Sequence, residues 1–109
     1  MQLVFIVIHE PDMLQDVLTG LLEVGVTTAT ILESQGMGQA VMDRLSIFSG
    51  FRDLWRGELG YNKTLFTVVE DDVVLELAAV VKDILSSSDS LSKGIIFSVP
   101  VGHFIRLSD

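Results

Sequence analysis

Residues 3–8, Leu3-Val4-Phe5-Ile6-Val7-Ile8, form the stretch of sequence that decides the fold. The run is short, apolar and rich in β-branched side chains, and a polar stretch with Pro11 follows it, which predicts a strand buried on both faces. It is far shorter than the roughly 20 apolar residues that span a bilayer, and no basic segment precedes it as in a signal peptide. We therefore expect a central strand in a chain that does not insert into a membrane.

The composition of the chain indicates one folded globular domain. Its 109 residues are 49% hydrophobic and 20% charged, with 2 Pro, which is typical of a packed core and excludes intrinsic disorder. The 7 Lys and Arg against 15 Asp and Glu give a net charge of −8, which repels nucleic-acid phosphates and anionic lipid surfaces. The absence of cysteine excludes disulfides, thiolate metal sites and a cysteine nucleophile. We expect a single domain over residues 1–109, located in the cytoplasm, that binds no nucleic acid.

The segments after the first strand alternate between helical and extended patterns. Apolar residues recur at helical spacing from Pro11 to a C-cap at Gly25, and residues 26–33 are β-prone and predict a second strand. The helical stripe consists of Leu14, Val17, Leu18, Leu21 and Leu22.

The second half of the chain repeats this order. Residues 64–70 predict a third strand, and the acids Asp71 and Asp72 then stand at the expected N-terminus of a second helix. This helix gives way to the serine-rich residues 86–90, and residues 95–99 predict the last strand, which Pro100 ends. The second apolar stripe consists of Val74, Leu77, Ala78, Val81 and Leu85.

The order of these elements predicts an α+β, ferredoxin-like fold. It is βαββαβ, with a four-stranded antiparallel sheet, two helices on one face and a long excursion over residues 34–63 between the second and third strands. Two helices cover only one face of the sheet, yet residues 3–8 contribute apolar side chains to both faces. Either the excursion folds back over the second face or other copies of the chain cover it, and we favour oligomerisation.

Three motifs carry a resemblance to a known family. Gly25-Val26 leads into a strand followed by Gly36-Met37-Gly38, Trp55-Arg56-Gly57-Glu58 lies in the excursion, and residues 96–101 read Ile-Phe-Ser-Val-Pro-Val. They resemble the G-[IV] turn with its G-F-G, the Y-R-G-A-E and the I-F-V-L-P-V of the nitrogen-regulatory PII signalling family. The resemblance implies a homotrimer that binds ATP, ADP or a related effector between its subunits. It also implies a regulatory protein, not an enzyme, which acts on an unidentified protein partner through a T-loop-like arm, residues 34–63.

The departures from the family pattern lie where its members bind phosphate. The family's B-loop ends T-G-x-x-G-D-G-K before I-F, whereas residues 90–95 here read Ser-Leu-Ser-Lys-Gly-Ile and place Ile95 at the position of the lysine. A phosphate cradle needs close backbone approach and fixed positive charge, so this change predicts weak or absent ATP binding. Lys93 either replaces the missing cation or is a solvated surface residue. Arg106 matches the first arginine of the family's R-x-R, and Ser108 stands in place of the second.

The resemblance and the chemistry of these residues together define a candidate effector site for a small anionic ligand. Its members are Gly36, Met37, Gly38 and Gly94 as backbone donors, with Lys93 and Arg106 as positive charges. An adenine nucleotide is the effector that the family implies, and no cofactor is expected.

The arm is unusually apolar for a connection between strands. Val41, Leu45 and Phe48 have helical spacing, so part of residues 39–49 is expected to form an amphipathic helix. Phe48, Phe51 and Trp55 either pack on the protein's own trimer or anchor a partner protein, because aromatic residues dominate binding hot spots. The family's modified arm tyrosine has no match, because the nearest tyrosine, Tyr61, lies beyond Gly60.

No catalytic constellation is present in the sequence. His9 and His103 are the only histidines, there is no Ser-His-Asp set, and neither histidine has neighbours that define a metal site. The leading hypothesis is therefore a PII-like trimeric regulator that senses a small anionic effector at subunit clefts. The alternatives are a trimeric adaptor that has lost nucleotide binding, and a metal-binding trimer that rests on the two histidines alone.

Overall fold

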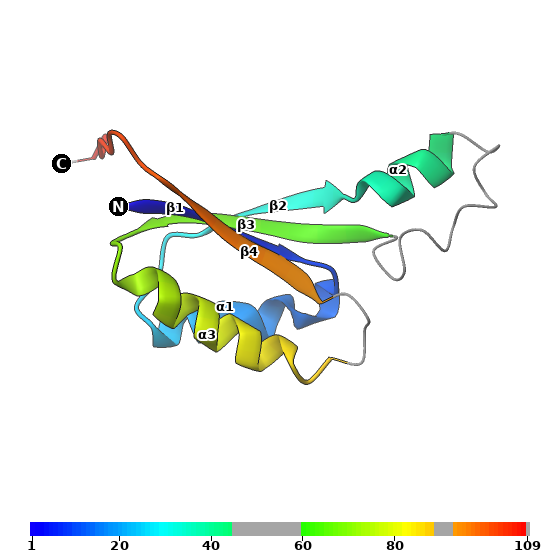
Figure 1. The fold of residues 1–109 in the computed structure, drawn as a ribbon, viewed down its shortest axis with the longest axis horizontal. Helices are drawn as coiled ribbons and strands as arrows, with labels where there is room; N and C mark the ends of the chain where they lie inside the picture. Colours follow the sequence, from blue (N-terminus) through cyan, green and yellow to red (C-terminus); the bar gives the residue numbers. More distant parts are fainter. Residues whose placement is uncertain (45–59, 89–92, 109) are drawn as a thin grey trace.

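The computed structural model describes residues 1–44, 60–88 and 93–108, which form an α+β fold with two helices beneath a four-stranded antiparallel sheet (Figure 1). The strand order is β2-β3-β1-β4, as the ferredoxin-like prediction requires. The elements are β1 (Gln2–Ile8), a 3₁₀ helix η1 (Pro11–Met13), α1 (Leu14–Glu23), β2 (Thr30–Gln35), α2 (Met37–Arg44), β3 (Tyr61–Val69), α3 (Val73–Leu85) and β4 (Gly94–Pro100).

Strand β1 lies in the middle of the sheet and pairs with β3 on one side and β4 on the other. Its side chains alternate between the two faces of the sheet. On the face toward α1 and α3, Val4, Ile6 and Ile8 are fully buried. On the other face, Leu3, Phe5 and Val7 are only partly buried. The prediction of a central strand is confirmed. Among the described residues, however, the helices cover only one face of the sheet.

Helix α1 (Leu14–Glu23) follows the 3₁₀ turn that begins at Pro11, and Gly25 lies just past its end, as predicted. Gly25 has a φ of +83°, and its N–H donates to the Leu22 carbonyl at 3.0 Å, which satisfies one of the last carbonyls of the helix. Val17 and Leu21 are buried, but Leu22 is 62% exposed. The prediction that Leu22 belongs to the buried stripe is wrong, because the contact with α3 and the sheet covers a narrower part of the helix than the sequence suggests.

Helix α3 follows its predicted pattern, since Leu77, Val81 and Leu85 face the sheet and are buried. We expected the acids Asp71 and Asp72 to stabilise the N-terminus of this helix through their charge. Asp72 occupies the N-cap position without a capping hydrogen bond from its side chain, and Asp71 forms an ion pair with the N-terminal ammonium of Met1 at 3.0 Å. The side chain of Asp71 therefore ties α3 to the start of β1.

The second strand is shorter at its start than predicted. It begins at Thr30, where pairing with Phe66 starts, and residues 26–29 form a connection in which Val26 is buried in the core. A β-branched residue suits a buried connection as well as a strand, so propensity alone does not reveal where the partner strand begins.

The prediction that the arm spans residues 34–63 and that the third strand starts at residue 64 is wrong at both ends, because β2 extends to Gln35 and β3 begins at Tyr61. Helix α2 lies in the first part of the arm; it confirms in part the helix expected within residues 39–49 and starts two residues before that range. Phe48, Phe51 and Trp55 lie outside the described residues. Among the residues that are described, no helix has the length and apolar character needed to cross a bilayer.

Candidate functional site

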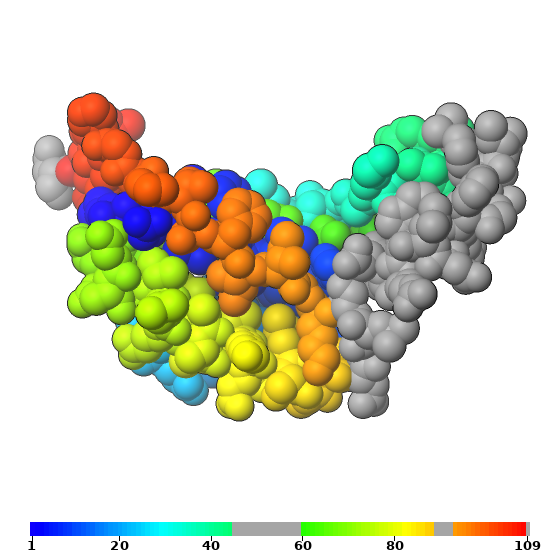
Figure 2. All heavy atoms as spheres, viewed as in Figure 1, coloured from blue at the N-terminus to red at the C-terminus, as the bar shows by residue number. Residues whose placement is uncertain are grey.

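The face of the sheet opposite α1 and α3 is apolar, and no other described element packs over it; we call it the uncovered face. It carries Ile95, Phe97 and Val99 from β4, which are 54%, 47% and 43% exposed, and Leu32 from β2, which is 48% exposed. Figure 2 shows the C-terminal end of the chain and α2 rising at either end of this face, with a concave stretch between them. Apolar patches of this kind on a monomer mark interaction sites.

Three phenyl rings cross the middle of the uncovered face. Phe5 lies directly opposite Phe66 on one side and Phe97 on the other. Its ring centroid is 4.9 Å from that of Phe97, in a stacked arrangement, and 6.1 Å from that of Phe66. Aromatic pairs on neighbouring strands stabilise the sheet at this point.

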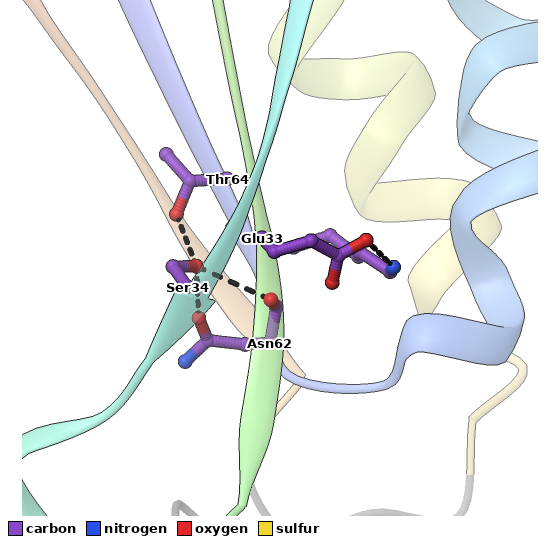
Figure 3. A network of polar contacts seen from close by, with 5 residues as sticks. Glu33, Ser34, Asn62 and Thr64 are labelled. Carbon is purple, nitrogen blue, oxygen red and sulfur yellow. Dashed lines mark hydrogen bonds and ion pairs between the residues drawn. The ribbon is translucent and has the colours of Figure 1, made fainter. Parts of the chain in front are cut away.

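A polar cluster interrupts the apolar face near the arm (Figure 3). The hydroxyls of Ser34 and Thr64 are 2.7 Å apart, and Ser34 also contacts the backbone carbonyl and the side-chain carbonyl of Asn62. Glu33 and Lys63, the neighbouring cross-strand pair, form an ion pair on the other side of the sheet. These contacts join β2 to β3 at the point from which the arm leaves the sheet.

Asp43 holds helix α2 against this junction. Its carboxylate accepts hydrogen bonds from Gln35 Nε2 at 3.0 Å, Gln39 Nε2 at 2.8 Å and the Tyr61 hydroxyl at 3.2 Å. The three donors come from the end of β2, from α2 itself and from the start of β3, so one carboxylate fixes the first turns of the arm.

The predicted donors of the arm stand at the start of α2. Gly36 donates its N–H to the Gly60 carbonyl at 3.5 Å and accepts the first helical hydrogen bond from Ala40 at 3.1 Å. Gly38 is buried inside the first turn, and Met37 is 76% exposed. The N–H groups of the first helical turn have no partners within a helix, so this is where an anion would find backbone donors.

Lys93 and Gly94 lie at the same end of the sheet as the arm, at the start of β4. Lys93 Nζ donates to the Ser86 carbonyl at 3.2 Å, and its own carbonyl accepts the His9 N–H at 3.1 Å. Gly94 has a φ of +152°, and a Cβ there would stand 2.2 Å from the Val7 carbonyl oxygen. Close approach of β4 to β1 is therefore a sufficient reason for this glycine, which sequence reasoning assigned only to ligand binding.

Arg106 lies at the other end of the sheet, in the segment that follows β4, residues 101–108, which we call the tail. Its guanidinium carbon is 5.5 Å from the centre of the Phe104 ring. The two side chains border a hollow of about 300 Å³ whose lining also includes Thr28, Thr30 and Phe66. Thr28 and Thr30 were not among the predicted site residues, and their only signal in the sequence was their position just after the Gly25-Val26 motif.

One chain does not bring the predicted effector residues together. Lys93 precedes β4 and Arg106 follows it. The 7 residues of this strand span about 20 Å. Gly36, Met37 and Gly38 are at the arm end with Lys93, but β3 and β1 separate the strand that precedes them from β4. The two positive charges share one binding site only if a second copy supplies one of them.

Titratable groups are spread over the surface. His9 follows β1 at the arm end and His103 lies in the exposed tail, and within the described ranges no three His, Asp or Glu side chains gather as a metal site. The hydrogen bond and charge of the N-terminal ammonium lower the pKa of Asp71.

Comparison with known proteins adds one finding. The family model described as "Nitrogen regulatory protein P-II" matches residues 1–109, the whole chain. No match is found among curated proteins. The family match spans every element described above, including both ends of the sheet.

Proposed function

The chain belongs to the P-II nitrogen regulatory protein family, and we propose that it works as a homotrimer that senses a small anionic, nucleotide-type effector between its subunits. Members of this family are regulatory signalling proteins, not enzymes; they are typically trimeric and interact with other proteins. The proposal concerns which of those properties this chain has and which residues provide them.

The exposed apolar side chains of the uncovered face support the proposed trimer. Phe97, Ile95 and Val99 are each close to half exposed in one chain, and they adjoin the stacked Phe5 ring. Covering such side chains removes apolar surface from water at about 25 cal/mol per Å². Packing of the same face from three copies satisfies all of them without any other partner.

The separation of the positive charges supports a binding site between subunits. Lys93 precedes β4 and Arg106 lies beyond its other end, and the strand itself is about 20 Å long, so the arm end of one copy needs the tail of another to complete a site with both charges. The hollow beside Arg106 has room for a flat group against Phe66 and Phe104, with Thr28 and Thr30 as polar neighbours. Gly36, Met37 and Gly38 would add backbone donors from the arm end, and Gly94 would allow close approach.

The output is proposed to pass through the arm. Asp43 joins α2 to both β2 and β3, so a ligand that favours one position of α2 would shift the arm in proportion to its differential affinity. Phe48, Phe51 and Trp55 remain the predicted anchors for a partner protein.

The alternative is a trimeric adaptor that no longer binds a nucleotide. Two contacts favour it: Lys93 Nζ is engaged with the Ser86 carbonyl, and Gly94 is explained by its contact with Val7. In this case the arm docks a partner constitutively.

Thermal unfolding of the purified protein with ATP, ADP and cyclic dinucleotides separates the two functions. A sensor gains stability that rises with ligand concentration, and Arg106→Ala and Lys93→Ala each lose that gain. Glu76→Ala, which removes an exposed charge of α3 outside the hollows beside Lys93 and Arg106, serves as the control. If a trimer by light scattering shows no shift with any of these ligands, the adaptor is the correct function.

A further inference from the structure

An apolar groove opens at the surface between α3 and the start of β4. Figure 2 shows these two segments side by side. The groove encloses about 280 Å³, and the aliphatic side chains that line it are Ala78, Val81 and Leu85 from α3 and Ile95 and Ile96 from β4. Val81 and Leu85 are also members of the buried core, so the groove reaches from the surface to the core.

Two small residues leave the groove open. Ala78 contributes only a methyl group, and Gly94 has no side chain. A larger residue at position 94 is excluded, because a Cβ there would stand 2.2 Å from the Val7 carbonyl oxygen. Protein interiors are close-packed, and an apolar hollow with a few polar groups at its border is the usual form of a small-molecule site.

Two lysines supply the charge of the groove. Lys82 from α3 and Lys93, which precedes β4, complete its lining. Within the part of the chain that the structure describes, neither lysine forms an ion pair. Lys93 Nζ donates one hydrogen bond, to the Ser86 carbonyl at 3.2 Å, so its ammonium keeps further donors. In a chain with a net charge of −8, two unpaired lysines at one apolar groove favour an anionic ligand.

We propose that this groove binds a small amphipathic carboxylate, with its aliphatic chain against α3 and β4 and its carboxylate toward Lys82 and Lys93. At about 30 Å³ per water-sized atom, the groove holds roughly nine heavy atoms, which matches a chain of about eight carbons. The chain replaces water against aliphatic side chains, and the carboxylate accepts charge-assisted hydrogen bonds from the ammonium groups.

The lining selects this ligand over a nucleotide. No aromatic ring from the described ranges borders the groove, so the groove offers no stacking surface for a base, whereas the hollow beside Arg106 is lined by Phe66 and Phe104. The amphipathic ligand therefore differs in class from the proposed nucleotide-type effector. All of its proposed contacts come from one chain, so the inference requires neither the trimer nor the effector.

Titration calorimetry of the purified protein with octanoate, in the absence of any nucleotide, tests the proposal. Octanoate should bind, and 1-octanol and butyrate should each bind at least about tenfold more weakly, because the first lacks the charge and the second lacks most of the chain. No octanoate binding at millimolar concentration, or equal binding of octanoate and 1-octanol, would overturn the proposal. Neither result depends on whether the chain senses a nucleotide.

Substitutions locate the binding to this groove. Ala78→Leu fills the groove and should weaken octanoate binding at least about tenfold, whereas Ala79→Leu, on the same helix but lining the separate hollow between α1 and α3, should bind as the natural protein does. Lys82→Gln and Lys93→Gln keep the length of the side chain but remove the charge, and each should weaken binding about tenfold. Circular dichroism checks that every variant is folded. Equal binding by the two leucine variants, or binding that neither lysine substitution changes, contradicts the proposed site.

Discussion

The ring of Phe5 is stacked on the ring of Phe97, with 4.9 Å between their centroids, on the face of the sheet opposite α1 and α3. Their strands are paired in register at these two residues, so the contact depends on the pairing of β1 with β4. Phe97 is 47% exposed even in this stack. The pair is thus both a structural contact of the chain and the centre of its proposed interface.

Phe97→Asp should convert the proposed trimer into monomers, because a carboxylate at the centre of the uncovered face cannot be buried without a partner. Size-exclusion chromatography with light scattering measures the mass directly. Leu22→Asp, at a 62% exposed leucine of α1, is the control and should remain trimeric. A trimer in both variants would show that the uncovered face is not the interface.

Gly94→Ala should lower the free energy of unfolding by about 2 kcal/mol or more, since the new methyl group would meet the Val7 carbonyl oxygen and φ is positive. Gly102→Ala has open space around its Cβ and should change stability by less than about 0.5 kcal/mol. Urea unfolding measures both. Similar stabilities for the two variants would contradict the close approach of β4 to β1.

Thr67→Val should stabilise the protein by about 1 kcal/mol. Among the described residues, the hydroxyl of Thr67 is the buried side-chain polar group that has no hydrogen-bond partner, and removing it relieves that desolvation cost. Thr64→Val is the matched control on the same strand; it removes the contact with Ser34 and should destabilise by about 1 kcal/mol. Thermal or urea unfolding of the two variants should therefore move in opposite directions.

Asp71 should make the stability of the chain depend on acid pH. Its pKa is lowered in the folded protein, chiefly by the hydrogen bond from the N-terminal ammonium, so its contribution is fully present above the ordinary value of 3.8 and is lost as pH falls through the lower folded value. Asp71→Asn should be less stable than the natural protein at pH 7, and the difference should shrink below about pH 4. Asp72→Asn, which removes no side-chain capping hydrogen bond, is the control. A difference that is constant with pH would contradict the ion pair.

Trp55 is the only tryptophan, so its fluorescence reports on the arm alone. We predict that Trp55 is buried against protein, which gives a blue-shifted emission with slow quenching by acrylamide, because a buried Trp removes on the order of 150–250 Å² from water. A red-shifted, freely quenched emission in the pure trimer would exclude packing on the trimer. A blue shift on addition of a candidate partner would then favour the docking role.

Local patterns in the sequence predicted the order and type of the main elements, but not all of their bounds. The apolar run of residues 3–8, the helical stripes beginning at Leu14 and Val74, and the C-cap at Gly25 each depend on neighbours within a few residues of the chain. The β-α-β order, repeated on either side of the arm, leaves few arrangements of four strands, and the observed order β2-β3-β1-β4 is the predicted ferredoxin-like one. The start of β2 was misplaced because a strand begins where its partner begins, which is not a local property.

The sequence by itself determined which residues carry charge, aromatic surface and backbone freedom, since these are properties of single side chains and short motifs. Only the tertiary structure decided how they combine. It placed Lys93 and Arg106 at opposite ends of β4, gathered three phenyl rings from separate strands on one open face, and gave Gly94 a steric role against Val7. Distances between residues far apart in the chain depend on strand direction and register, and these are set by packing across the whole sheet.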